Sequence, residues 1–308
     1  MHGSVIETVP NVSEGRQPGV IAALAAAVRG RGVFVLDHSA DPSHNRAVFT
    51  VVGHAAALEA AILRLVGVAV AHIDLRRHRG AHPRIGAVDV VPFIPLAGST
   101  MRDCVELSRS VARAIATRFG IPTYLYEESA ARPERRRLEH IRRGQFEGLA
   151  AKMRQPDWTP DFGPGAPHPS AGATVVGARR PLVAFNVNLD SADSRLATSI
   201  AEAIRESSGG LPAVKALGLA LPDRGVAQVS MNLTDYTRTS VQAAFDAVER
   251  AAAARGVRVL ESELIGLIPE AALAGTTPAR LRLTGFRQGQ LLEERIREMT
   301  AAPQPSEG

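Results

Sequence analysis

Hydrophobic and polar residues along this chain alternate with the period of a helix, about 3.6 residues, in some segments and with the two-residue period of a strand in others. These segments occur in the same order in both halves of the chain. In the first half the pattern predicts strand 4–9, helix 18–29, strands 33–37 and 47–52, helix 54–73 and strand 88–94. In the second half it predicts strand 182–189, helix 191–207, strands 213–220 and 226–233, helix 239–255 and strand 257–263. Each half therefore has the order of a split βαβ unit of the ferredoxin-like type.

This order predicts an α+β fold of two ferredoxin-like (βαββαβ) subdomains, with mixed or antiparallel sheets and the helices outside. We expect the subdomains, and then a disordered tail, at 1–180, 181–300 and 301–308. An insertion between the two copies adds a helix at 101–119 and a strand at 123–126. It ends in 156–172, which is too rich in proline and glycine for regular secondary structure and long enough to bind a ligand.

Composition narrows the class of protein. The 308 residues are 45% hydrophobic and 22% charged, as in ordinary globular proteins, and the single cysteine, Cys104, excludes an internal disulfide. The sequence has no run of about 18 uncharged apolar residues and no signal-peptide pattern, so we expect a cytoplasmic protein without a membrane partner. A pI near 10.1 keeps a nucleic-acid-binding protein as an alternative class, but an aromatic content of 4% opposes stacking on bases.

A basic loop at 75–86 precedes the strand at 88–94 and carries the first candidate for catalysis, His82. Pro83 restricts the backbone of His82 to an extended conformation, and the neighbouring arginines favour a neutral imidazole. A neutral imidazole takes a proton from one nitrogen and returns it to another, which is what group transfer between amines requires. The alternative is an ordinary histidine in a solvated basic loop.

Asparagines form the second candidate group, since they fall at strand ends or inside strands, where asparagine is disfavoured: Asn11, Asn45, Asn186, Asn188 and Asn232. Asn186 and Asn188 share one face of their strand and indicate a polar cleft for a heterocycle or for carboxylates. An exposed sheet edge is the alternative. The histidines lack metal-ligand spacing, so no metal is predicted, and the signatures of nucleotide-dependent enzymes, serine hydrolases and zinc proteases are absent from the sequence.

Short motifs then follow one another in collinear order between about residues 5 and 270. The main ones are Val9–Gly15 (VPNVSEG), Arg77–Asp89 (RHRGAHPRIGAVD), Pro122–Tyr126 (PTYLY), Phe185–Leu189 (FNVNL) and Ala227–Leu233 (AQVSMNL). Each motif alone is weak, but the ordered set resembles the formiminotransferase domain of the formiminotransferase–cyclodeaminase family. The cyclodeaminase half of the bifunctional members is not part of the resemblance.

The resemblance implies two subdomains whose sheets face one another around a substrate tunnel, usually in a homodimer. It implies the activity of a glutamate formimidoyltransferase in histidine degradation and one-carbon metabolism. In that reaction the formimino group of N-formimino-L-glutamate passes to tetrahydrofolate, giving 5-formimidoyltetrahydrofolate and L-glutamate. Tetrahydrofolate is the co-substrate, and neither a metal nor nucleic acid is expected to bind.

The resemblance also implies site residues. The family's catalytic histidine falls on His82, and its folate-contacting segment falls on Gly163, Pro164, Gly165, Ala166, Pro167, His168, Pro169, Ser170, Ala171 and Gly172. Candidates for binding the substrates are Asn11, Ser39, Asp41, Arg84, Arg179, Asn186, Asn188, Lys215 and Asn232. Among these, Arg84, Arg179 and Lys215 are expected to hold the glutamate carboxylates, because guanidinium–carboxylate pairing suits that task.

Two departures from the family pattern leave the substrates open. Animal members carry Phe, Val and Trp where this chain has Pro167, His168 and Ala171, so aromatic surface for the pterin is missing. They also carry an acid, the proposed partner of the catalytic histidine, where this chain has Ser39, with Asp41 two residues further on. The alternatives are a glutamate formyltransferase that uses N-formylglutamate and a folate-binding homologue without turnover.

Overall fold

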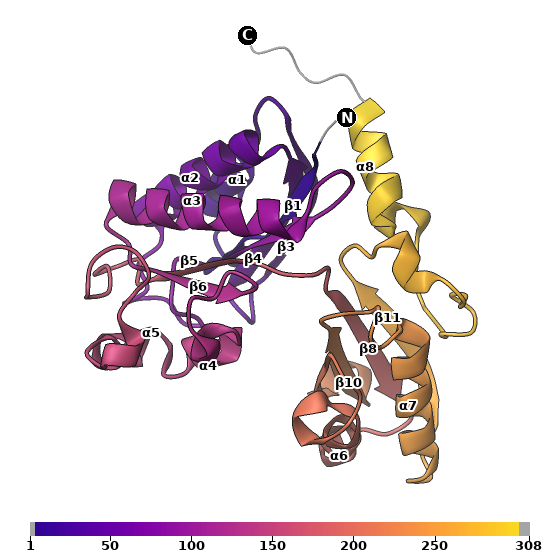
Figure 1. The fold of residues 1–308 in the computed structure, drawn as a ribbon. Helices are drawn as coiled ribbons and strands as arrows, with labels where there is room; N and C mark the ends of the chain where they lie inside the picture. Colours follow the sequence, from indigo (N-terminus) through magenta and orange to yellow (C-terminus); the bar gives the residue numbers. More distant parts are fainter. Residues whose placement is uncertain (1–3, 302–308) are drawn as a thin grey trace. The chain divides into compact units, whose positions relative to one another are not determined.

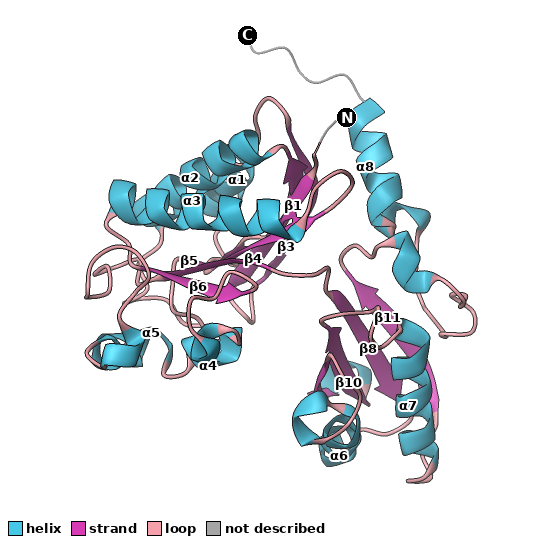
Figure 2. Cartoon of the chain, viewed as in Figure 1, coloured by secondary structure: helices cyan, strands magenta, loops and turns pink. Residues whose placement is uncertain are grey.

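The computed structural model describes residues 4–301 (Figure 1). The described parts of Met1–Arg179 and Met299–Gly308 form one compact unit, and Arg180–Glu298 forms the second. The last helix, α8 (Leu292–Ala301), includes the first residue of the predicted tail, and residues 302–308 lie outside the described part of the chain. Helices and strands alternate in both units, which confirms the predicted α+β class (Figure 2).

The first unit contains a mixed, seven-stranded sheet. Its strands are β1 (Ile6–Thr8), β2 (Asn11–Val12), β3 (Val33–Asp41), β4 (Arg46–Gly53), β5 (Val88–Pro95), β6 (Thr123–Glu127) and β7 (Thr174–Ala178). Both β1 and β2 pair antiparallel with β4 on one side and β5 on the other, and β3 continues the sheet beyond β4. Parallel pairing of β7 with β5 and of β6 with β7 extends it at the other end.

Helices cover the two faces of this sheet unequally (Figure 1). The long helices α1 (Pro18–Ala27), α2 (Ala55–His72) and α3 (Met101–Phe119) pack on one face and bury the larger core. The short α4 (Leu138–Arg142) and α5 (Gln145–Met153) cover the other face beside β5, β6 and β7, where Ile141, Leu149 and Met153 are buried. The helices α4 and α5 are not among the elements predicted from the sequence.

Helix α2 is the only described helix with the length and hydropathy of a membrane span. Glu59 and Arg64 interrupt its apolar sequence, and Leu58, Ile62 and Leu65 are fully buried in the core of the first unit. An amphipathic helix that buries one face against a sheet is the ordinary element of a globular core. The packing of α2 accounts for its apolar composition without a membrane.

The second unit is an antiparallel sheet of four strands in the order β11–β8–β10–β9. These strands are β8 (Val183–Leu189), β9 (Val214–Leu221), β10 (Val226–Leu233) and β11 (Val259–Ile265). Helices α6 (Ser194–Ile204) and α7 (Val241–Ala253) pack on one face and bury a core of their own. Helix α6 begins three residues later than predicted, because Asp193 caps it by accepting a hydrogen bond from the amide of Arg195.

Candidate active site

The loop that carries His82 lies directly on the turn between β3 and β4. Its closest approach is at Gly80, where a Cβ would lie 2.2 Å from the carbonyl oxygen of His44, so only glycine fits. The Asn45 side chain fastens the segments together: its Oδ1 accepts the amide of Gly15 (2.9 Å) and its Nδ2 donates to the carbonyl of Arg79 (3.0 Å). The position of His82 is thus fixed by segments distant in sequence.

His82 is half-buried, and its ring has a defined tautomer. The Nη1 of Arg46 lies 2.8 Å from Nε2 of His82. A guanidinium only donates hydrogen bonds, so Nε2 presents its lone pair and the proton sits on Nδ1. Burial, reinforced by the charges of Arg46 and Arg142, lowers the pKa of His82 to about 3. The neutral imidazole predicted from sequence is present, but the cations responsible are not its neighbours in the loop.

A second histidine accompanies His82. The ring of His44 meets the ring of His82 edge-on, with centroids 6.3 Å apart and an interplanar angle of 66°. The Nδ1 of His44 lies 2.6 Å from Oδ2 of Asp41, whose Oδ1 accepts the amides of Ser43 and His44 (2.8 and 2.9 Å). Burial raises the pKa of Asp41, but the hydrogen bonds from His44 outweigh it and leave this pKa below its ordinary value. Within the described residues no hydrogen bond joins Asp41 to His82; His44 lies between them, and the charge of Asp41 also acts on His82.

Ser39, by contrast, is exposed on the edge strand β3, opposite Val48 of β4. Within residues 4–301, no hydrogen bond joins Ser39 to His82. The strand extends to Asp41 instead of ending at residue 37 as predicted, and this extension places Ser39 in the strand and Asp41 at its end. Of the two residues considered as the partner of His82, Asp41 lies close to it and Ser39 lies on the surface.

Two arginines make the surroundings of His82 strongly cationic. The Nε of Arg46 is buried and has no hydrogen-bond partner within the described chain. Burial, with the nearby charge of Arg142, lowers the pKa of Arg46. Arg142 is held through its Nε and Nη2, which lie 2.8 and 2.5 Å from Oδ2 of the buried Asp89. Such a pair of guanidinium groups suits a carboxylate of the substrate.

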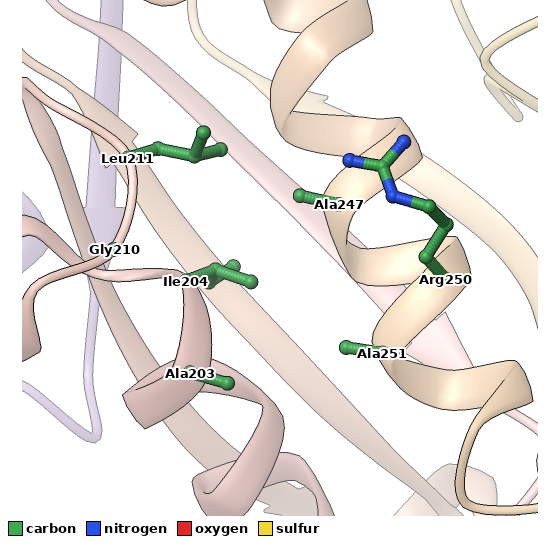
Figure 3. A pocket seen from close by; sticks show the side chains of 7 residues that line it. All are labelled: Ala203, Ile204, Gly210, Leu211, Ala247, Arg250 and Ala251. Carbon is green, nitrogen blue, oxygen red and sulfur yellow. The ribbon is translucent and has the colours of Figure 1, made fainter.

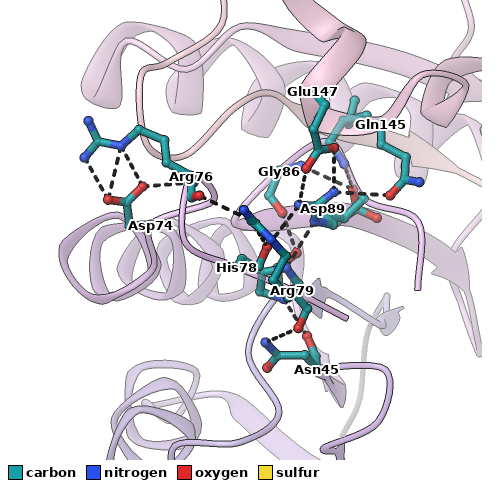
Figure 4. Close-up of polar contacts among 12 residues, drawn as sticks. Asn45, Asp74, Arg76, His78, Arg79, Gly86, Asp89, Gln145 and Glu147 are labelled. Carbon is teal, nitrogen blue, oxygen red and sulfur yellow. Dashed lines mark hydrogen bonds and ion pairs between the residues drawn. The ribbon is translucent and has the colours of Figure 1, made fainter. Parts of the chain in front are cut away.

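The remaining basic residues of the loop have structural contacts. His78 donates from Nε2 to the carbonyl of Asn45 (2.9 Å) and accepts at Nδ1 from Nε of Arg84 (3.1 Å). Arg84 is buried and forms a two-pronged ion pair with Glu147 (2.8 and 2.9 Å). Figure 4 shows Glu147 and His78, two partners of Arg84, among the polar contacts of this region. The hydrogen bonds from Arg84 lower the pKa of Glu147 to about 2. Arg84 would have to leave Glu147 to bind a substrate carboxylate as predicted.

The predicted folate segment is anchored to both ends of the His82 loop. The carbonyls of Ser170 and Ala171 accept the amides of Leu75 and Ala87 (2.8 and 2.9 Å). Gly172 has φ +69°, and a Cβ there would lie 2.0 Å from the carbonyl of Ile85. Ala171 is fully buried, so its small size satisfies packing and its side chain offers no surface to a folate. The exposed members are Gly163, Pro164, Gly165, Ala166 and Pro169.

Arg179 and Asn11 also lie in the first unit. Burial raises the pKa of Tyr126 to about 12 against the opposing charges of Arg179 and Arg142, and Arg179 also makes a hydrogen bond to this phenol. Arg179 and Arg142 therefore act on one buried side chain. Asn11 on β2 donates from Nδ2 to the carbonyl of Val9 (2.9 Å), which holds its amide against its own strand.

The other predicted residues share one face of the sheet in the second unit, opposite α6 and α7. Asn186 and Asn188 lie on the central strand β8, which excludes the exposed-edge alternative. The nearly buried Gln228 donates to Oδ1 of Asn188 (2.9 Å) and to Oε1 of Glu263 (2.7 Å). Lys215 and Asn232 are exposed and face each other across β9 and β10. The predicted polar face is present, and it also includes Gln228 and Glu263, which were not among the predicted site residues.

Other features of the described chain carry no catalytic group. No cluster of three or more histidine, cysteine or acidic side chains suited to a metal occurs in residues 4–301. Cys104 is buried on α3, and burial raises its pKa to about 12, so it is no nucleophile. A pocket between α6 and α7 is mainly apolar (Figure 3); its lining is Ala203, Ile204, Gly210, Leu211, Ala247, Arg250 and Ala251.

Comparison with known proteins decides the family. The model of the formiminotransferase domain, N-terminal subdomain, matches residues 5–179, and that of the formiminotransferase domain matches residues 184–280. The chain belongs to the formiminotransferase family. It is 46% identical over 294 residues to the glutamate formimidoyltransferase of Streptococcus pyogenes serotype M1, covering 95% of this chain and 98% of that one.

Two further relatives agree with this assignment. The glutamate formimidoyltransferase of Thermoplasma acidophilum is 41% identical over 296 residues, covering 95% of this chain and 97% of that one. The formimidoyltransferase-cyclodeaminase of Sus scrofa is 42% identical over 275 residues, which cover 87% of this chain and 51% of that enzyme. This formiminotransferase thus corresponds to about half the length of the bifunctional relative, as the sequence motifs predicted.

The residues around His82 in this formiminotransferase include three that sequence reasoning missed as site residues: His44, Arg46 and Arg142. Arg46 directly follows the predicted Asn45, and Arg142 lies in a polar, arginine-rich stretch between the two repeats. The acid inside the strand at 88–94 was the available signal, since a buried Asp89 requires a cation. Nothing in the spacing indicates that Arg142, 53 residues away, is that cation.

Proposed function

We propose that this chain is a glutamate formimidoyltransferase that moves the formimino group from N-formimino-L-glutamate to tetrahydrofolate. Two relatives of that name, 46% and 41% identical across 95% of the chain, support the proposal. The observation that carries it at the level of chemistry is the neutral His82, which presents its Nε2 lone pair to the guanidinium of Arg46. A proton acceptor and a carboxylate ligand lie side by side there.

In the proposed reaction a reduced ring nitrogen of tetrahydrofolate attacks the formimino carbon, and a bond from that carbon to the folate nitrogen forms. The folate nitrogen must lose a proton, and the glutamate nitrogen must gain one before its bond to carbon breaks. His82 accepts the first proton and supplies the second, so that it ends neutral as it began. No oxidant, reductant or metal takes part in this balance.

Arg46 couples substrate binding to this proton transfer. Its Nη1 occupies the Nε2 lone pair of His82, and that lone pair must be released before His82 can act as a base. A substrate carboxylate paired with Arg46 draws the guanidinium away and neutralises its charge, which raises the proton affinity of His82. Arg46 and Arg142 thus replace Arg84 as the proposed carboxylate ligands, with Arg179 as a third.

For the folate, we retain the exposed part of the segment from Gly163 to Pro169, and we omit Ala171 because it is buried. The polar face of the second unit supplies amide and carboxylate groups that can orient a pterin or an amidine. Its proposed members are Asn186, Asn188, Lys215, Asn232 and the newly found Gln228 and Glu263. Asn11 keeps its place as a proposed ligand in the first unit.

The finer architecture belongs to the same proposal. The strand order β11–β8–β10–β9 and the order β5, β1 with β2, β4, β3 support ferredoxin-like subdomains, each with two crossing helices. We place them at 1–180 and 181–300. A tunnel between facing sheets, a homodimer and a cytoplasmic location stay predictions of the resemblance.

A single incubation tests the proposed function. The purified protein is mixed with tetrahydrofolate and either N-formimino-L-glutamate or N-formyl-L-glutamate, and the folate products are identified by mass spectrometry. We expect 5-formimidoyltetrahydrofolate from the first donor. Formation of formyltetrahydrofolate from the second donor alone would make the chain a glutamate formyltransferase, and folate binding without either product would make it a non-catalytic homologue.

A further inference from the structure

The pair formed by Asp41 and His44 has no part in the reaction described so far, although it touches the proposed catalytic histidine. The carboxylate of Asp41 is fixed by the amides of Ser43 and His44 and by Nδ1 of the His44 ring. Three hydrogen bonds thus determine where the carboxylate lies. Because a carboxylate oxygen can only accept, Nδ1 of His44 carries the proton and donates it to Oδ2 of Asp41. This hydrogen bond sets the orientation of the His44 ring.

The orientation of His44 bears directly on His82. The two rings meet edge-on with centroids 6.3 Å apart, and the Nη1 of Arg46 holds Nε2 of His82 at 2.8 Å. Both contacts come from one short turn, residues 41–46, so the ring of His82 is positioned by that turn. A proton-transfer group misplaced by about 1 Å loses much of its efficiency, which gives such a turn a direct effect on turnover.

Stability does not explain the pair. The side chains of Asp41 and His44 are each 48% exposed. An exposed ion pair contributes only about 0–1 kcal/mol to folding, because solvent screens the charges and ordering the side chains costs entropy. Asp41 nevertheless accepts three hydrogen bonds, one of them from the ring of His44, which contacts His82. A role in orienting the rings of His44 and His82 explains these contacts better than stability does.

We propose that Asp41 acts on His82 through His44, which makes His44 a positioning residue for the transfer reaction. This inference rests on the proposed function and deepens it. The charged and titratable groups that act on His82 are Arg46, Arg142, His44 and Asp41. Of these, Asp41 and His44 belong to one pair, while Arg46 and Arg142 are assigned to the substrate carboxylate.

The test is a double-mutant cycle on kcat with saturating formiminoglutamate and tetrahydrofolate. We expect His44→Ala to lower kcat about 10-fold, a fraction of the roughly 10²–10⁴-fold that a positioned acid–base group supplies, with KM for both substrates nearly unchanged. In a His82→Ala background, His44→Ala should cost nothing further, because His44 works only through His82. Asp41→Asn should lower kcat less than His44→Ala and add nothing to it.

Ser43→Ala is the matched control, since it changes the same turn at an exposed residue that contributes only its backbone to these contacts. Its kcat should equal that of the wild type. Thermal unfolding of each variant checks the fold, and Asp41→Asn carries the test if His44→Ala does not fold. If His82→Ala has no measurable turnover, the ¹⁵N shifts of the His82 ring decide: His44→Ala should change them, because the ring loses its edge-on contact, and Ser43→Ala should leave them unchanged.

The outcomes separate this inference from the proposed function. Wild-type kcat in His44→Ala, together with a large loss in His82→Ala, overturns the role of His44 and leaves the function intact. A further loss when His44→Ala is added to His82→Ala also overturns it, because His44 then acts independently. Absence of turnover by the wild-type protein with either donor contradicts the function itself.

Discussion

At the residue scale, the contact between Arg46 and His82 orients the imidazole and blocks its Nε2 lone pair, and burial keeps the ring neutral. The guanidinium of Arg46 occupies the Nε2 lone pair, while burial and two cations lower the pKa of the ring to about 3. A histidine in this state is a weak base until a negative charge arrives. In the proposed reaction the formiminoglutamate carboxylate supplies that charge, which links substrate binding to base strength.

Replacing Arg46 tests this linkage. We expect Arg46→Ala to lower kcat/KM for formiminoglutamate by roughly 10–10²-fold through a higher KM, since a charged hydrogen bond to a carboxylate is worth about 1.5–3 kcal/mol. The same change should raise the pKa of His82 towards its ordinary value, which ¹⁵N NMR titration measures. Arg46→Lys keeps the charge without the planar fork and should recover only part of the affinity. An unchanged KM in Arg46→Ala contradicts the assignment.

The depressed pKa of His82 also predicts how stability depends on pH. In the unfolded chain a histidine titrates near 6.5, and in the folded protein His82 titrates at about 3. Between these values the unfolded state binds more protons, so the free energy of unfolding falls as the pH drops from about 6.5 towards 3. His82→Gln should therefore lose less stability over this range than the wild type. Urea unfolding at several pH values measures the free energy of unfolding, and His72→Gln, at an exposed histidine, is the control. If the free energy of unfolding of His82→Gln falls with pH as steeply as that of the wild type, the result contradicts the burial of a neutral ring.

At the element scale, the turn at 41–46 and the loop at 78–82 form one structure because glycine permits their contact. Strands and helices of both units follow from hydrophobic periodicity, which acts over neighbouring residues and is visible in the sequence. Periodicity does not predict elements that depend on contacts with distant parts of the chain. These elements are the extension of β3 to Asp41 through polar residues, the short β7, and the helices α4 and α5 of the arginine-rich stretch. The ion pairs that make α4 part of the site join residues far apart in sequence, such as Asp89 and Arg142.

Gly80 provides the test at this scale. A Cβ at this position would lie 2.2 Å from the carbonyl oxygen of His44 and 2.8 Å from Cβ of Asn45, so Gly80→Ala must displace the loop that carries His82. We expect a loss of stability of about 1–3 kcal/mol and a fall in kcat, because overpacking shifts the backbone. Gly19→Ala, in α1 where a Cβ meets nothing within 4 Å, is the control: it should leave kcat unchanged and should not lower stability, because alanine favours a helix over glycine. A fully active Gly80→Ala contradicts the close packing of loop and turn.

At the scale of the whole molecule, the basic composition has an internal explanation. Many arginines form ion pairs within their own unit, including Arg84 with Glu147, Arg142 with Asp89 and Arg280 with Asp246. Paired charges scattered over two units do not make the continuous basic surface that nucleic acid requires. The nucleic-acid-binding class that the pI suggests thus loses its main support. Arg46, for which the described residues contain no ion pair, is the cation near His82 that we propose for a carboxylate of a small substrate.

Sequence motifs are sufficient for the family and also point to His82 as the proposed catalytic residue, because both depend on short stretches of residues in fixed order. The carboxylate ligands and the partner of His82 were not predictable in the same way. Position along the chain predicts Arg84 and Ser39 as candidates, but Arg84 is engaged by Glu147 and Ser39 is exposed on an edge strand. The residues that surround His82 come from a turn and a helix that only the fold brings together.

The turnover of His82→Ala shows whether His82 transfers the proton during formimino transfer. The rate of 5-formimidoyltetrahydrofolate formation from formiminoglutamate and tetrahydrofolate is measured for the wild type and the variant, with circular dichroism to confirm that both are folded. We predict a wild-type protein that turns over and a variant slower by about 10²–10⁴-fold. Turnover of folded His82→Ala at nearly the wild-type rate would contradict the account.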